Sequence, residues 1–371
     1  MRVALVSVGL GRIRRGFERY MADLADVVRS PDLEVTLFKA AGENTPREKV
    51  PPLYPAIRRA LGFLPTTSLV GGRDYREYKR DSLAFALGLL PELVRGRFDV
   101  LHVIDPPLAV ILDGLRRRFP FRTPIVFTEG TLMPPPFYPS GMHIHLTALE
   151  TYQEALCMGV PKEKLTLLPV GLHVRDFVTT AERAELRRKY DVPESRFVVL
   201  LVTAIRRIHK RVHYAIDEVS RTPGDVLLWI DGNQEDPVAV ELARQKLGPR
   251  CRITHVPSAD VPELCRLADV MVHCATNEAY GLAVAEALAS GVPTLVHDSP
   301  HFEWLTRGRE CLVDMSRRGA LAERLQGIAE QRDEYAAAPD AKAEKMRAWL
   351  DWGALRDGYV DMYRRVSALR P

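Results

Sequence analysis

Short apolar runs alternate with helical or polar stretches along the whole chain, and they fall into two successive sets. The first set comprises residues 3–8, 34–38, 100–104, 125–128, 143–147 and 165–168. The second comprises residues 197–202, 226–230, 253–256, 270–273, 294–296 and 312–313. Short apolar runs separated by helical stretches are typical of parallel strands covered by helices. The pattern therefore predicts an α/β fold class with two successive parallel domains.

The crossing point between the two sets is expected at residues 168–171, the segment Leu-Pro-Val-Gly. We expect a first domain over residues 1–170 and a second over residues 171–352. A charged stretch from Ala181 to Lys189 predicts the helix that opens the second domain. The proline-rich stretch at residues 133–139 predicts a stiff loop after a strand.

Length and charge set bounds on this picture without changing it. A chain of 371 residues is long enough for about two domains with separate cores. The net charge of +4 is mild and gives no strong signal for nucleic acid. Three clustered arginines, Arg12, Arg14 and Arg15, follow the first strand, where an α/β sheet places its ligands. They hint at an anionic or phosphate-bearing partner.

The cysteines and the N-terminal run indicate where the protein works. Its five cysteines are odd in number, scattered, and lack a C-x-x-C pair, which argues against a disulfide framework or a zinc site. The first apolar run is too short for a signal peptide, and no long apolar span follows. We therefore expect a cytoplasmic protein with at most a peripheral membrane contact.

The segment at residues 277–293, NEAYGLAVAEALASGVP, carries two carboxylates eight positions apart. Residues 282–289 are compatible with a helix that ends near Gly291, so Glu278 precedes the helix and Glu286 lies within it. Alternatively, this is an ordinary amphipathic helix in which Glu286 faces water and Glu278 stands near the positive end of the dipole.

The start of this helix suits a phosphorylated ligand. The first helical amides, near Gly281, Leu282 and Ala283, are donors without intrahelical partners at the positive end of the dipole. Glu286 lies about one turn deeper, roughly 5–6 Å along the axis. A ribose beside a bound diphosphate could satisfy this carboxylate with two hydroxyls.

The whole string resembles the signature E-x-(F/Y)-G-L-x-x-x-E-A-x-A-x-G-x-P of retaining glycosyltransferases of family 4. The resemblance implies a GT-B fold, in which two Rossmann-like domains face a central cleft, the first on the acceptor side and the second binding a nucleotide-sugar donor. It places Glu278 beside the donor sugar and diphosphate, and Glu286 on the ribose. Tyr280 occupies the aromatic position of the same motif.

Further segments extend the resemblance in the expected order. Residues 9–11 and 16–19 are similar to the glycine-rich loop and first helix that face the acceptor and donor phosphate, which adds Gly11 and Gly16 to the site. Residues 98–103 resemble the family's D-V-V-H strand, and residues 159–165 its G-V-P-x-x-K segment. The linker P-x-G-V-D-x-x-x-F is matched at residues 169–177 except that His173 replaces the aspartate. A terminal helix, at about residues 353–371, is of the kind that packs back onto the first domain.

Residues 204–211 lie where the family carries G-R-x-x-x-x-K-G, whose Arg and Lys bind the diphosphate. Lys210 matches the lysine, but Ile205 stands in the register of the arginine, so Arg206 and Arg207 compete for that role. Surface basic residues at a helix start are also common. His209 and His213 have the spacing of a metal pair, but without a third ligand we interpret them as exposed helix residues.

A second departure lies in the first domain. Ile104 stands where many relatives have a histidine beside the donor sugar, and Glu129 stands at a further histidine position. Asp105 and Glu129 end parallel strands on the ligand side of the sheet, so they are expected to line the sugar pocket or to act on the acceptor proton. Alternatively, they are caps at strand ends.

The resemblance implies a retaining transferase that uses a nucleoside-diphosphate sugar and a glycan, lipid-linked or small-molecule acceptor, with no metal or other cofactor. Two further hypotheses stay open: a nicotinamide oxidoreductase, although Arg14 occupies the third-glycine position, and a degenerate GT-B protein that binds a nucleotide sugar or glycan as a sensor. The expected catalytic residues are Lys210, Arg206, Glu278, Asp105 and Glu129, and the expected donor contacts add Gly11, Arg207, Val256, Tyr280, Gly281, Leu282, Ala283 and Glu286. Val256 enters because the family reads the base near that loop.

Overall fold

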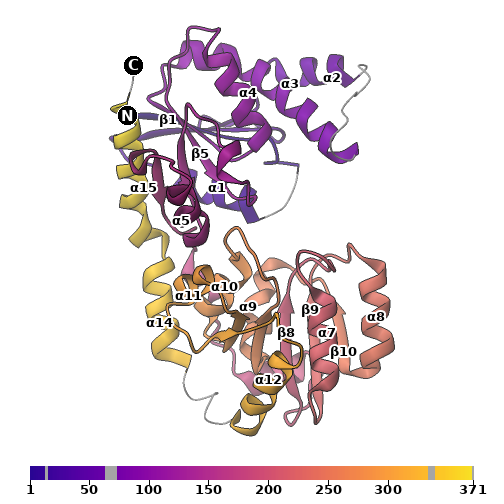
Figure 1. Ribbon diagram of the computed structural model, residues 1–371. Helices are drawn as coiled ribbons and strands as arrows, with labels where there is room; N and C mark the ends of the chain where they lie inside the picture. The colour runs from indigo at the N-terminus through magenta and orange to yellow at the C-terminus, as the bar shows by residue number, and fades with distance from the viewer. Residues whose placement is uncertain (13–15, 63–72, 333–338, 370–371) are drawn as a thin grey trace. The chain divides into compact units, whose positions relative to one another are not determined.

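The computed structural model describes residues 1–12, 16–62, 73–332 and 339–369. The chain divides into two compact units (Figure 1). Unit 1 comprises Met1–Gly171 and Leu355–Pro371, and unit 2 comprises Leu172–Ala354. None of the described helices combines the length and the apolar character needed to cross a membrane.

Unit 1 is built on a seven-stranded parallel sheet with the order β3-β2-β1-β4-β5-β6-β7. Its strands are β1 (Arg2–Ser7), β2 (Glu34–Lys39), β3 (Glu48–Lys49), β4 (Val100–Val103), β5 (Ile125–Glu129), β6 (His143–Leu146) and β7 (Leu165–Leu167). Its helices are α1 (Gly16–Val27), α2 (Tyr54–Gly62), α3 (Arg73–Gly96), α4 (Pro106–Arg116), α5 (Leu149–Cys157) and most of α15 (Trp352–Ser367), with short 3₁₀ turns at Pro135–Phe137 and Lys162–Lys164.

Helix α15 is attached to the sheet of unit 1 through buried polar contacts. The Tyr363 hydroxyl is hydrogen-bonded to Nδ1 of His102 at 2.7 Å, and the Tyr359 hydroxyl donates to the Pro169 carbonyl at 2.8 Å. The chain of contacts continues from Nε2 of His102 to the Thr128 hydroxyl, 2.5 Å away. These hydrogen bonds are buried and directional. They therefore fix the orientation of the C-terminal helix, in addition to the packing of its apolar side chains.

Unit 2 contains a six-stranded parallel sheet with the order β10-β9-β8-β11-β12-β13. Its strands are β8 (Phe197–Val202), β9 (Val226–Asp231), β10 (Cys251–Thr254), β11 (Val270–His273), β12 (Thr294–His297) and β13 (Leu312–Val313). In β8, Val199 and Leu201 join one apolar cluster while Val198 and Leu200 join another. Both faces of β8 are therefore buried, which explains its unbroken apolar sequence.

Helices cover both faces of this sheet (Figure 1). The helices of unit 2 are α6 (Arg183–Lys189), α7 (Val212–Arg221), α8 (Pro237–Leu247), α9 (Val261–Leu267), α10 (Leu282–Ser290), α11 (Pro300–Thr306), α12 (Ala320–Glu330) and α14 (Pro339–Leu350), with 3₁₀ turns at Val174–Phe177, Gly248–Arg250 and Ser258–Asp260. Buried residues of α7, α8 and α12 share one cluster with the sheet. Residues of α6, α9 and α10 share the other.

The predicted α/β class with two parallel sheets is confirmed, and most predicted strands lie within a residue or two of the observed ones. The strand expected at residues 253–256 is displaced by two residues, because β10 spans Cys251–Thr254. Its ladder with β9 ends at the pair Thr254–Asp231, and the Val256 amide beyond it donates to the Asp231 side chain. The two-residue strand β3 was not predicted, and the loop at residues 133–139 contains a 3₁₀ turn.

Each sheet has one topological switch point, where the order in which the chain adds strands reverses from one side of the sheet to the other. In unit 1 this place lies between β1 and β4, and in unit 2 between β8 and β11. Loops leaving the carboxyl ends of two such strands diverge and leave room for a ligand. The expected donor residues of unit 2 follow these two strands, β8 and β11, except for Val256, which follows β10.

Candidate functional site

The loop that follows β8, residues 203–211, is fixed to the end of the neighbouring strand β9. The Thr203 amide donates to the Asp231 carbonyl at 2.9 Å, and the Ile205 amide donates to the Asn233 carbonyl at 2.8 Å. Gly232 has φ of 149°, and a Cβ atom there would stand 2.1 Å from the Thr203 carbonyl oxygen. Only glycine allows this close approach.

The loop presents its predicted cations in different ways. Ile205 is completely buried in the core of unit 2, so the residue in the register of the family arginine serves packing. Arg206 and Arg207 are exposed, and they pair with Glu235 and, at 2.6 Å, with Asp236. Both guanidinium groups are therefore paired with carboxylates of the loop after β9. Their role at a diphosphate stays a prediction.

Lys210 meets the first carboxylate of the motif. Its Nζ donates to Oε1 of Glu278, which is 7% exposed. Burial raises the pKa of Glu278, but His273 and Lys210 more than offset this effect and bring the pKa to about 2. Glu278 is therefore ionised at neutral pH and is a buried anion beside a cation.

Helix α10 begins beside this pair, as the sequence predicted. Its N-cap is Gly281, with φ of 94° and ψ of 53°, a left-handed conformation that favours glycine. Leu282 and Ala283 are the first helical residues, and both are partly exposed. Their amides lack an intrahelical acceptor by geometry, so this helix start can receive an anion.

Glu286 lies within α10 and is partly exposed. Tyr280 is buried, and its carbonyl accepts a hydrogen bond from Nε2 of His301 at 2.8 Å. The Tyr280 carbonyl therefore connects the turn before α10 to α11, and a direct contact of the Tyr280 ring with a donor stays a prediction. The contact of Glu286 with a ribose also stays a prediction.

Val256 is engaged inside the protein. Its amide donates to Oδ1 of Asp231 at 2.9 Å, the atom that also accepts from the Thr254 hydroxyl at 2.7 Å. A base that approached this loop would find the Val256 amide already bonded. A base contact through the Val256 amide would therefore require the Asp231 bond to be exchanged, and the expected donor role of Val256 stays a prediction.

The glycine-rich loop of unit 1 is shaped by a close approach. Gly11 has φ of 84°, and a Cβ atom there would stand 2.2 Å from the Ala41 carbonyl oxygen. The Arg12 guanidinium pairs with Asp81 at 2.7 Å and lies over the Tyr54 ring. Gly16 is exposed at the start of α1. The expected acceptor residues Arg14 and Arg15 lie outside the described residues.

Asp105 and Glu129 behave as caps in this structure. Asp105 is 5% exposed and accepts from the Val8 amide at 2.9 Å and the Tyr78 hydroxyl at 2.7 Å. Oε1 of Glu129 accepts from both the amide and the hydroxyl of Thr131. Burial raises the pKa of both carboxyls. Of the two readings left open by the sequence, these contacts favour the cap, and a role at the sugar stays a prediction.

Histidines near Glu278 were not identified by the sequence. His273 is the last residue of β11, and its Nε2 lies 3.5 Å from Oε1 of Glu278. His209 lies 3.8 Å from the same oxygen. His209 is exposed, as predicted, but it precedes α7 and belongs to the loop, so its assignment to a helix was wrong. His273 could have been identified from the sequence, because it stands at the carboxyl end of a predicted parallel strand, where ligands bind.

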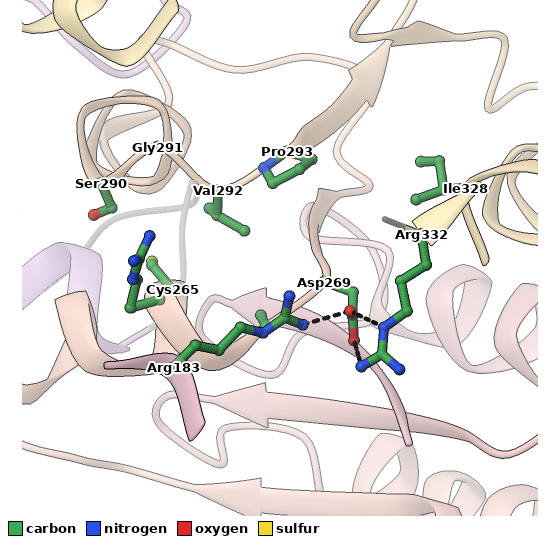
Figure 2. Close-up of a pocket in the computed structure, with 11 residues that line it drawn as sticks. Arg183, Cys265, Asp269, Ser290, Gly291, Val292, Pro293, Ile328 and Arg332 are labelled. Carbon is green, nitrogen blue, oxygen red and sulfur yellow. Dashed lines mark hydrogen bonds and ion pairs between the residues drawn. The ribbon is translucent and has the colours of Figure 1, made fainter. Parts of the chain in front are cut away.

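A separate ion cluster lies at the amino end of β11. Asp269, just before this strand, accepts from Arg183, from Arg187 at 2.8 Å and from Arg332 at 2.6 Å. Figure 2 shows Arg183 and Arg332 directed at Asp269 from opposite sides of a cavity of about 140 Å³. Glu278 follows the same strand at its other end, so this cluster is distinct from the candidate site. It ties α6 and the segment after α12 to the sheet.

Known proteins match both the fold and part of the sequence. Residues 182–346 match the sequence model of glycosyl transferases group 1. The α-monoglucosyldiacylglycerol synthase of Acholeplasma laidlawii is 26% identical over 149 residues, which are 38% of this chain. The match spans 37% of that curated relative.

Solved structures match over nearly the full length of the chain. A sucrose-phosphate synthase from Thermosynechococcus elongatus is 17% identical, with 99% of each chain covered and a TM-score of 0.78. HepE of Anabaena, solved in complex with UDP and glucose, is 15% identical, with 98% of this chain and 99% of that chain covered and a TM-score of 0.73. The chain therefore adopts the GT-B fold, and part of its second unit matches the sequence model of glycosyl transferases group 1.

Proposed function

We propose that the protein is a glycosyltransferase that moves a sugar from a nucleoside-diphosphate sugar to a glycan, lipid-linked or small-molecule acceptor. The observation that carries the proposal is the meeting of Lys210, Glu278 and the start of α10 at the point between β8 and β11. A cation, helical amides and a carboxylate are the groups that a diphosphate and its sugar require. HepE, with the same fold, was solved with UDP-glucose.

In the proposed reaction the anomeric C–O bond to the diphosphate breaks as an acceptor oxygen bonds to the anomeric carbon. Negative charge accumulates on the leaving diphosphate. Lys210 and the amides of Leu282 and Ala283 would stabilise that charge, which is the main contribution open to these residues. The departing phosphate would take the acceptor proton.

Retention of configuration and independence from a metal belong to the same proposal. They rest on the resemblance of residues 277–293 to family 4. The acceptor would bind on unit 1, near Arg12, Gly16 and the two neighbouring arginines. An anionic acceptor would suit these cations, and a peripheral contact with a membrane would suit a lipid-linked one.

A transfer assay tests the function. Purified full-length protein is given uridine, guanosine and adenosine diphosphate sugars with acceptor panels, with and without a chelator. We expect release of nucleoside diphosphate together with a glycosylated acceptor of unchanged anomeric configuration by NMR, and activity that persists with the chelator. Absence of transfer and of donor hydrolysis across the panel would contradict the proposal.

A sensor or partner subunit with the same fold is the second candidate function. It is favoured by Ile205, which is buried where the family has an arginine, and by the internal bonding of Asp105 and Glu129. Calorimetry separates the candidates. Nucleoside diphosphate binding without any turnover would support the sensor, whereas turnover would remove it.

A further inference from the structure

One oxygen of Glu278 is approached by three nitrogens, two from the loop at residues 203–211 and one from the end of β11. Nζ of Lys210 donates to Oε1, and Nε2 of His273 and of His209 lie 3.5 Å and 3.8 Å from it. Glu278 is buried, and its charge requires a partner there. Of these three, Lys210 is the partner in hydrogen-bond contact in the structure.

A bound diphosphate would compete for the same lysine. A lysine ammonium is a single charge on a flexible stem, so it moves toward the larger negative charge when one is offered. The side chain of Lys210 is 22% exposed and that of Glu278 is 7% exposed, so a ligand reaches the lysine more easily. Without another donor, Glu278 would then be left as a buried and unpaired anion, which is costly.

His273 is placed to supply that donor. Its side chain is 3% exposed, and among the described residues neither ring nitrogen has a hydrogen-bond partner. Buried polar atoms of this kind require an explanation, since most find a partner. At 3.5 Å, Nε2 is just beyond a good hydrogen bond to Glu278, and a small rotation of the carboxylate would close the gap.

The surroundings keep the imidazole in this place. The His273 ring packs edge-on against Phe302, with ring centroids 5.7 Å apart. Phe302 belongs to α11 and is completely buried, so its ring restricts the movement of the His273 ring. His301, on the same helix, uses its Nε2 on the Tyr280 carbonyl and does not compete for Glu278 through that atom.

We propose that His273 is a positioning residue that receives Glu278 when the donor diphosphate takes over Lys210. This inference rests on the proposed function. The bond from Lys210 to Oε1 is replaced by a bond from Nε2–H of His273 to the same oxygen. The carboxylate stays ionised, and Oε2 is held toward the donor sugar. Neutral imidazole is sufficient, since one ring N–H is the donor.

A pair of polar variants tests the exchange. In H273Q the side-chain amide reaches the place of Nε2, whereas in H273N it ends near the place of Nδ1. Calorimetry measures the affinity of each full-length variant for nucleoside diphosphate and nucleotide sugar. We expect H273Q to stay near the wild type and H273N to bind about 10- to 100-fold more weakly. Thermal unfolding without ligand is measured first, and we expect it to be similar in both.

The Glu278→Gln background is the matched control. A neutral amide needs no charge partner, so H273N should change ligand affinity little when Glu278 is already glutamine. This non-additivity distinguishes the exchange from loss of packing. If H273N weakens binding equally in both backgrounds, or if it binds like H273Q, the inference is wrong although the proposed function stands. If the wild type binds no nucleotide ligand, both are wrong.

Discussion

At the residue scale, the candidate site depends on one well-placed cation. The sequence left Arg206, Arg207 and Lys210 as possible diphosphate ligands. In the structure the two arginines pair with acidic residues of the next loop, and Lys210 reaches the buried carboxylate. Lys210 is therefore the residue whose removal should affect the chemistry most.

Lys210→Ala should lower turnover by about 100-fold or more, because the cation that stabilises the leaving group is lost. Donor affinity should fall less, since the helical amides and Glu286 remain. Steady-state kinetics separate kcat from KM. Lys246→Ala, which removes a half-exposed lysine paired with Asp217, is the matched control. A loss of affinity with unchanged kcat would reject the leaving-group role.

Glu286→Gln should weaken nucleotide binding by about 1–3 kcal/mol, because a charge-assisted bond to a ribose hydroxyl is lost. Calorimetry with the nucleoside diphosphate measures this. Glu241→Gln on α8 is a control, since the Glu241 side chain is 56% exposed and pairs with an exposed arginine. Equal affinity of the Glu286 variant and the wild type would exclude the ribose contact.

At the element scale, the hydrophobic pattern predicted most strands. It could not predict side-chain contacts between segments that are distant in the sequence. Residues 197–202 and 270–273 were predicted at their observed bounds because they are apolar runs, the first followed by Thr203 and the second ending at His273. The end of β10 could not be predicted, because the strand stops opposite Asp231, the last residue of the neighbouring strand β9. His273 was missed for the same reason: its meeting with Glu278 depends on how the chain turns after β11.

The cluster around Asp269 shows how such contacts join elements. Burial raises the pKa of Asp269, but three arginines and the Val198 amide more than offset it, and the pKa lies below its ordinary value. Asp269→Asn should lower the free energy of unfolding by about 3–5 kcal/mol, because buried guanidinium charge loses its partner.

Denaturant unfolding measures the effect of Asp269→Asn. Asp225→Asn is the matched surface control. Asp225 also pairs with an arginine, but its side chain is 52% exposed, and the expected cost is about 1 kcal/mol or less. Similar losses in the two variants would show that the Asp269 cluster contributes no more than a surface pair.

At the scale of the whole molecule, the buried histidines of unit 1 should make stability depend on pH. Burial lowers the pKa of His145 to about 3 and that of His143 to about 4, and it brings the pKa of His102 well below 6.5. Below pH 6.5 the unfolded chain therefore binds more protons than the folded one. The stabilising contribution is complete above pH 6.5 and is lost as the pH falls toward these values.

The free energy of unfolding should accordingly fall between about pH 6.5 and 4, by about 1.4 kcal/mol per pH unit for each histidine that stays neutral. Urea unfolding at several pH values measures the slope. His145→Gln should reduce this slope by the contribution of one histidine, about 1.4 kcal/mol per pH unit, since glutamine does not titrate. Identical slopes in variant and wild type would contradict the assignment.

The central claim is that the full-length protein holds a nucleoside-diphosphate sugar where Lys210, Glu278 and α10 meet. Thermal unfolding with uridine, guanosine and adenosine diphosphate sugars tests it most directly, since a ligand of the folded state raises the midpoint by mass action. We predict a concentration-dependent rise with the sugars of one base, and a smaller rise in Glu286→Gln. No rise with any of the sugars at saturating concentrations would contradict the claim.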